Sequence, residues 1–272
     1  MRELLSNPAV QGGLAPFVAA LIVAELFQRM RLSGLCIIAG FALTVYLING
    51  GIAFDPLTAS RKIVLAGLLS ALLALILLLY NPRWMRTMLA IAGGGVALWV
   101  MSRILQQQDA ASMVTWGAGC ALYVAWLVFW MDGLRDAPIR AGSAGLALGL
   151  GTGTAALFGA SALLGQFGLA LGAAAGAYLL IQMLTSKHLP CGRSFTLPLS
   201  LVAGLSGCLA VLTAQLPWYT LPVLGVIPLA AHIRFFDKQA LWLQSILLSV
   251  IPMACAAAAV YLTWRVAGAP PL

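Results

Sequence analysis

The sequence predicts an all-helical protein that spans a membrane ten times. Hydrophobic residues make up 62% of its 272 positions and charged residues only 8%, whereas soluble domains carry about 25% charged residues. The apolar stretches are about 20 residues long, as a transmembrane helix requires, and they lack the alternation of a membrane β-barrel strand. A water-soluble fold is therefore excluded.

The apolar stretches also predict where the individual spans lie. We expect them at residues 9–28, 32–50, 62–80, 86–105, 110–131, 141–163, 166–184, 195–214, 217–233 and 239–264. Gly12, Gly13 and Pro16 predict a bent or loosened start to the first span. Three consecutive glycines interrupt the span at 86–105, and the prolines of 217–233 prevent a regular helix throughout that span.

The distribution of basic residues predicts the orientation. Loops on one side hold ten of the 15 Lys and Arg residues, and such an excess marks the cytoplasmic side. These ten are Arg29, Arg31, Arg83, Arg86, Arg135, Arg140, Lys187, Arg193, Arg234 and Lys238. The other side holds Arg2, Arg61, Lys62, Arg103 and Arg265. We therefore expect an integral protein of a bacterial cytoplasmic (inner) membrane, with both termini outside. The net charge of +8 then reflects topology and not nucleic-acid binding.

Two spans carry glycine at every fourth residue. These glycines are Gly145, Gly149 and Gly153, followed by Gly168, Gly172 and Gly176. A spacing of four places each series on one helix face, and in lipid such a face lets a neighbouring backbone approach closely. The pattern predicts a tight helix pair, and it equally suits an interface in a homo- or hetero-oligomer.

The two halves of the chain follow the same rhythm of spans and loops. Residues 1–131 and 141–272 form two five-helix repeats of one membrane domain, joined by a cytoplasmic linker at 132–140. A shift of 134 residues aligns Trp84 with Trp218. Because five is odd, the second half enters the membrane in the opposite direction, which is an inverted-topology repeat typical of transporters. At the level of architecture only, the plan resembles small ten-span transporters of the drug/metabolite type, where we would expect the termini inside.

The same alignment predicts a binding site, because it places Gly94 on Pro228. Interrupted helices in matching positions indicate a cavity at the middle of the membrane, where freed backbone groups meet water or a solute. The candidate site residues are Pro16, Gly93, Gly94, Gly95, Gly149, Gly151, Pro222, Gly225 and Pro228. Glu25, placed inside a span, is either a coupling carboxylate or a local partner of Arg29.

Two further patterns lie in the middle of the chain. Trp116, Tyr123 and Trp130, spaced by seven, form a stripe that either lines a cavity or serves packing and interfacial anchoring. The linker residues Asp132, Arg135, Asp136 and Arg140 have spacings that favour local ion pairs.

The loop at 187–193 holds His188 and Cys191. Flanking Lys187 and Arg193 can lower the pKa of a thiol and make it reactive. Two ligands fall short of the four in a structural zinc site, however. We expect an ordinary basic loop facing the cytoplasm, no metal site and no cofactor.

Three functions fit this reading. The first is a permease or exporter that moves a small neutral or amphipathic solute, with the lipid bilayer as its other partner. The second is a non-catalytic accessory subunit that packs into a larger complex. The third, disfavoured, is an intramembrane enzyme, because Ser161 lies near the outer surface while His188 and His232 lie on the cytoplasmic side. A catalytic Ser–His pair must be within hydrogen-bonding reach.

Overall fold

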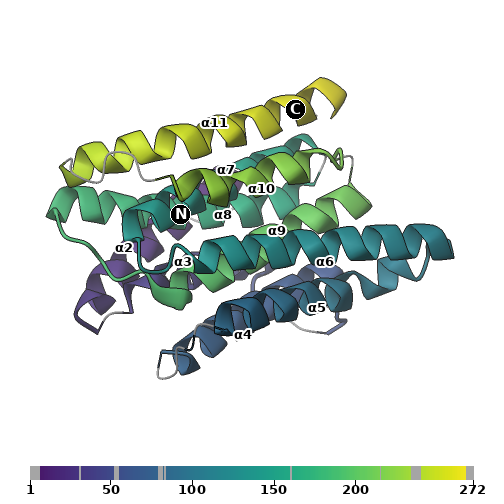
Figure 1. Ribbon diagram of the computed structural model, residues 1–272, viewed down its shortest axis with the longest axis horizontal. Coiled ribbons are helices and arrows are strands. Elements are labelled where there is room, and N and C mark those ends of the chain that lie inside the picture. Colours follow the sequence, from purple (N-terminus) through teal and green to yellow (C-terminus); the bar gives the residue numbers. More distant parts are fainter. Residues whose placement is uncertain are drawn as a thin grey trace.

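The computed structural model describes residues 7–30, 32–51, 55–78, 82, 84–159, 161–214, 216–233 and 240–267. Within these ranges the regular structure is helical, with ten α-helices and no strand. They are α2 (Ala15–Phe27), α3 (Cys36–Asn49), α4 (Ala59–Ile76), α5 (Met85–Leu105), α6 (Ala110–Asp132), α7 (Pro138–Phe158), α8 (Ala162–Thr185), α9 (Gly192–Thr213), α10 (Thr220–Ala231) and α11 (Leu241–Ala267). Figure 1 shows them as one bundle, with α4 and α5 along one edge and α11 along the opposite edge.

Each expected span contains one of these helices, but two are short. Eight helical segments of the described chain are long and apolar enough to cross a membrane, which indicates a membrane-embedded protein. The exceptions are α3 and α10, and α10 has only 12 residues. At 1.5 Å per residue α10 extends about 18 Å, which is less than the roughly 30 Å of a hydrocarbon core.

The first span begins irregularly, as its sequence predicts. A π-helical turn, η1 (Val10–Leu14), precedes α2. In this turn each N–H bonds to the carbonyl five residues earlier, and the Ala15 N–H still bonds to the Val10 carbonyl. The next donor in the series would be Pro16, which has no N–H to give to the Gln11 carbonyl. The hydroxyl of Thr44 in α3 donates to that Gln11 carbonyl instead, at 2.8 Å. A hydroxyl from a neighbouring helix thus satisfies the group that proline leaves unpaired.

Helices α7 and α8 meet backbone to backbone. A Cβ atom added to Gly149 would collide with the backbone of Gly172, and one added to Gly153 would collide with the backbone of Leu169 and Gly168. The glycine series of both helices therefore face each other. Because lipid tails are as apolar as the side chains, close van der Waals packing of this kind holds membrane helices together.

Helix α9 lies at the centre of the bundle, where it contacts α3, α4, α5, α6, α7 and α8. Every residue from Arg193 to Ala210 is buried. Its polar side chains mostly return to their own backbone. The Ser200 hydroxyl, for example, donates to the Thr196 carbonyl at 2.7 Å, which removes the cost of burying it.

Helix α5 corrects one expectation, because it runs unbroken through Gly93, Gly94 and Gly95. Two of these glycines serve packing. A Cβ at Gly94 would lie 3.0 Å from the Ala121 carbonyl oxygen, and one at Gly93 would lie 3.1 Å from a methyl group of Val128. Both contacts are with α6, so the missing side chains bring α5 against α6 without interrupting the helix.

The glycine contact between α7 and α8 predicts a position-specific loss of stability. Gly149→Leu would force a side chain into the Gly172 backbone, and overpacking costs about 1–3 kcal/mol. Its midpoint of thermal unfolding in detergent should fall by several degrees. Gly95→Leu is the matched control, since nothing lies within 4 Å of a Cβ there. Equal midpoints for the two variants would contradict the packing described.

Candidate functional site

A cavity lined by aromatic side chains lies between α6 and α10, and its volume is about 530 Å³. Helix α6 contributes Trp116, Gly119, Cys120, Leu122, Tyr123 and Trp126, α9 contributes Val211, and the α10 segment contributes Trp218, Leu221, Pro222, Gly225, Val226 and Leu229. The wall is almost entirely apolar. Two of the three residues in the aromatic stripe therefore line a cavity, while Trp130 lies beyond it.

One hydrogen bond fixes the spacing between α6 and α10 beside this cavity. The indole Nε1 of Trp126 donates to the Gly225 carbonyl at 3.0 Å. A Cβ at Gly225 would lie 3.6 Å from the rings of Trp126 and Tyr123, which is ordinary van der Waals contact. A larger side chain at Gly225 would therefore extend into the cavity and reduce the space left for a ligand.

Three buried hydroxyls have no hydrogen-bond partner among the described residues: that of Tyr123, which lines this cavity, and those of Thr152 and Ser206. The ring of Tyr123 and the methyl group of Thr152 both lie 3.8 Å from the Cβ position of Gly207, the residue after Ser206. Elsewhere in the helices, Ser and Thr hydroxyls such as that of Thr213 donate to the carbonyl four residues earlier. Unpaired buried polar groups are uncommon and are normally met by water or a ligand.

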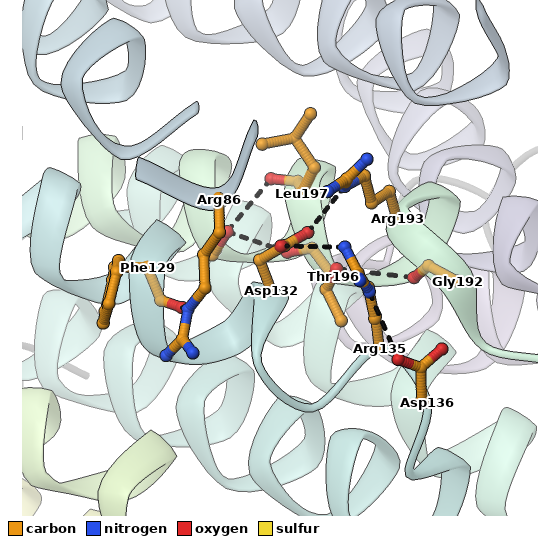
Figure 2. A network of polar contacts seen from close by, with 10 residues as sticks. Arg86, Phe129, Asp132, Arg135, Asp136, Gly192, Arg193, Thr196 and Leu197 are labelled. Atoms are coloured by element: carbon orange, nitrogen blue, oxygen red, sulfur yellow. Dashed lines mark hydrogen bonds and ion pairs between the residues drawn. The ribbon is translucent and has the colours of Figure 1, made fainter. Parts of the chain in front are cut away.

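A buried ion pair joins the ends of α6 and α9. The Arg193 Nε lies 2.9 Å from Asp132 Oδ1, and the two side chains are 4% and 3% exposed. Arg135 lies 3.4 Å from the other oxygen of Asp132, and it also pairs with the exposed Asp136 at 3.3 Å. Figure 2 shows Arg193 and Arg135 converging on Asp132. The expected local pairing in the linker is present, but the stronger contact is with α9.

Arg86, at the start of α5, is held by α6 without a carboxylate. Its Nε donates to the Phe129 carbonyl at 2.6 Å, and its guanidinium carbon lies 3.7 Å from the centre of the Phe129 ring. Trp130 packs edge-on against His232, with ring centres 5.2 Å apart. The His232 Nδ1 lies 2.8 Å from the Pro228 carbonyl. Because a carbonyl only accepts, this contact places a proton on Nδ1.

The structure does not gather the residues of the sequence-predicted site around one cavity. Pro222 and Gly225 line the aromatic cavity, whereas Gly93 borders a separate cavity of about 270 Å³ with residues of α4 and α9. Helix α10 packs mainly on α11, α7 and α6. Pro228 is buried at the inner face of α10. The cavity therefore forms opposite α6, where α5 was expected.

The other members of that set lie in helix contacts. A Cβ at Gly151 would approach Leu224 and Ala256 within 2.9 to 3.0 Å, so Gly151 brings α7 against α10 and α11. Gly149 lies in the glycine contact with α8. Pro16 packs under Gly40 of α3, whose Cβ position is 2.9 Å from the Pro16 carbonyl. A role for these residues in binding stays a prediction.

Glu25 is exposed at the end of α2, and its carboxylate accepts a hydrogen bond from Gln28 at 2.6 Å. The hydrogen-bond partner of Glu25 in the structure is thus Gln28, where the sequence suggested Arg29. Among the described residues, no group of three or more His, Cys, Asp or Glu side chains is placed to hold a metal ion.

The loop thiol differs from the reactive alternative considered above. Cys191 is 2% exposed, and burial raises its pKa well above the usual range of a thiol; the nearby Cys36 and Asp136 raise the pKa further. Lys187 and His188 are exposed instead. Because only the thiolate is nucleophilic, this arrangement makes Cys191 inert.

Ser161 and His188 lie beyond opposite ends of α8. The 24 residues of that helix extend about 36 Å. The structure therefore keeps this serine and this histidine far apart, as their sequence positions indicate.

Comparison of the chain with protein-family models, with curated proteins and with solved structures finds no match.

The buried ion pair predicts a large and specific loss of stability. Asp132→Asn would leave the Arg193 guanidinium buried without a counter-charge, and breaking a buried pair costs about 3–5 kcal/mol. Asp136→Asn is the matched control, because that side chain is 86% exposed and exposed pairs contribute about 0–1 kcal/mol.

Unfolding of the purified protein in detergent measures both effects. Replacing both partners, as Asp132→Asn with Arg193→Gln, should recover part of the loss, because no unpaired charge then remains. Equal stability of Asp132→Asn and Asp136→Asn would contradict a structural role for the pair.

Proposed function

We propose that this protein is a membrane permease for a small neutral or amphipathic solute, and that the solute binds in the aromatic cavity between α6 and α10. The observation that carries the proposal is the cavity itself. Its volume of about 530 Å³ lies within the roughly 300–1,000 Å³ of small-molecule sites, which combine apolar walls with a few polar groups. Tyr123 belongs to this wall, and its buried hydroxyl has no hydrogen-bond partner among the described residues.

The short helix α10 supports the same proposal. Transporter sites are commonly built from discontinuous helices near the middle of the membrane. Helix α10 has 12 residues, with Pro222 in its first turn and Pro228 inside it. The pairings of α2 with α3 and of α5 with α6 recur in the second half as α7 with α8 and α10 with α11, as an inverted repeat of residues 1–131 and 141–272 requires.

We further propose that the end of the bundle holding Arg86, Arg135 and Arg193 faces the cytoplasm of a bacterial cell, which places both termini outside. The excess of basic residues supports this orientation. The basic residues Arg2, Arg31, Arg83, Arg234 and Lys238 lie outside the described residues.

The alternative role, an accessory subunit, is favoured by one other surface. A groove of about 540 Å³ runs between α8 and α11, lined by apolar side chains together with Gly176, Ser245 and Ser249. Small residues at a membrane-facing surface suit contact with another helix.

Deleting the gene for this protein should change the distribution of one or a few small amphipathic metabolites between cells and medium. Expressing the wild-type protein again should restore the original distribution. Gly225→Leu should not restore it, because the leucine side chain would occupy the cavity. Gly95→Leu, which faces open space, is the control and should restore it. Mass spectrometry of cells and medium measures the distribution, and detergent unfolding confirms that each variant is folded.

Full rescue by Gly225→Leu would contradict transport through this cavity. An unchanged distribution on deletion, together with a stoichiometric partner that copurifies in mild detergent, would favour the accessory role.

The orientation predicts a labelling pattern. His188→Cys, at an exposed position between α8 and α9, should resist a membrane-impermeant maleimide in intact cells and react after permeabilisation. Gln107→Cys, exposed between α5 and α6, should react in intact cells. The native Cys191 does not interfere, because it is buried. The reverse pattern would invert the topology.

A further inference from the structure

The aromatic cavity ends one helical turn from a polar cluster. Its wall follows α6 as far as Trp126 and α10 as far as Leu229. The next turn of α6 presents Trp130, whose ring centre lies 5.5 Å from that of Trp126. The corresponding part of the α10 segment presents His232, packed edge-on against Trp130. Trp130 therefore packs directly against the last aromatic ring of the cavity wall on α6.

At this cluster two hydrogen-bond donors lack acceptors. Arg86 Nη2 and Trp130 Nε1 are both buried, and neither has a partner among the described residues. The Arg86 guanidinium carbon lies 5.4 Å from the centre of the Trp130 ring. A Cβ atom at Gly133 would lie 2.9 Å from Arg86 Nη2 and 2.8 Å from His232 Nε2. Arg86 Nη2 and His232 Nε2 therefore both lie against the backbone of Gly133, where only glycine fits.

The charges around this region leave it positive. Among the described residues at the start of α5, the end of α6, the linker that follows it and the starts of α7 and α9, the four arginines Arg86, Arg135, Arg140 and Arg193 stand against two aspartates, Asp132 and Asp136. Asp132 is already engaged by Arg193 and Arg135. Figure 2 shows the guanidinium of Arg86 turned away from Asp132 and toward Phe129. An anionic group would both neutralise Arg86 and accept from its free N–H.

From these observations we propose that the solute is a single-chain amphipathic anion. Its chain lies in the cavity between α6 and α10, and its carboxylate or phosphate group accepts hydrogen bonds from Arg86 Nη2 and Trp130 Nε1. This inference rests on the proposed function, and it names the substrate class of the same site. From Trp116 to Trp126 the cavity wall follows α6 over ten residue steps, about 15 Å at 1.5 Å per step.

Binding of radiolabelled octanoate to the purified full chain in neutral detergent tests the proposal, with octan-1-ol and octyl phosphate as competitors. Octanoate and octyl phosphate should bind at least tenfold more tightly than octan-1-ol, which has the same chain without the charge. Arg86→Gln should weaken octanoate binding at least tenfold and leave octan-1-ol binding within twofold, since hydrogen bonds to charged groups are the strong ones.

Two further variants keep the test decisive. Trp130→Phe retains the ring and removes the N–H, so it should weaken octanoate binding severalfold even where Arg86→Gln fails to fold. Arg103→Gln, in α5 but at its opposite end, is the matched control and should bind octanoate like the wild type. Weakening by Arg103→Gln equal to that by Arg86→Gln would overturn the assignment.

The outcomes separate this inference from the proposed function. If octanoate and octan-1-ol bind equally, with Arg86→Gln unchanged and Gly225→Leu defective for both, the anion site is overturned and the cavity stands. If neither compound binds the wild type, the proposed function fails as well. Displacement of octanoate by phosphatidylglycerol at equal concentration would overturn a single-chain ligand and make the site one for a phospholipid headgroup.

Discussion

The close contact between the backbones of α7 and α8 is the constraint on which the rest of the bundle depends. Because glycines face each other there, the two helices take little space, and their outer faces remain free for other partners. Helix α7 also contacts α9, α10 and α11, while α8 also contacts α2, α3 and α9. The pair therefore links the first helices of the chain to the last. It also sets the position of α10, since Gly151 of α7 lets Leu224 and Ala256 approach.

Polar groups inside the bundle fall into two classes: those with a hydrogen-bond partner and those without one among the described residues. Most helical Ser and Thr hydroxyls donate to a backbone carbonyl one turn earlier, as Ser200 and Thr263 do, and Thr44 satisfies the carbonyl left unpaired by Pro16. Tyr123, Thr152, Arg86 and Trp130 each keep a buried polar atom without a partner. In an apolar environment each such atom carries a desolvation penalty. Tyr123 lines the aromatic cavity, and Trp130 lies one helical turn beyond Trp126 at its end. Gln182 Oε1 and both Nη atoms of Arg193 also lack a partner among the described residues, but they belong to no part of that lining.

The sequence predicts the helices well and their neighbours less well. Composition and span length determine the ten helices, because a backbone in lipid must satisfy its own hydrogen bonds. Which helices touch depends on side-chain packing, so the loop rhythm could not reveal that α10 lies against α6. The stripe of Trp116, Tyr123 and Trp130 leaves cavity lining and packing as alternatives, and the structure places only Trp116 and Tyr123 in a cavity wall. The pairing of Asp132 with Arg193 could have been inferred only in part: both residues were expected on one side, but nothing in their spacing joins them.

The glycines show why the position of the aromatic cavity could not be predicted from the sequence. At Gly149 and Gly153 the backbone of α8 occupies the space that a side chain would need, so no cavity forms there. At Gly119 nothing lies within 4 Å of the Cβ position, and at Gly225 the nearest atoms are at 3.6 Å, so the missing side chains leave room that the cavity includes. The same residue type thus closes one interface and opens another. What distinguishes the two is the partner helix: α8 presents glycines that let α7 approach, whereas α6 presents tryptophan and tyrosine rings that keep α10 at a distance. The cavity exists because bulky rings on α6 face glycine and proline on a helix too short to cover them.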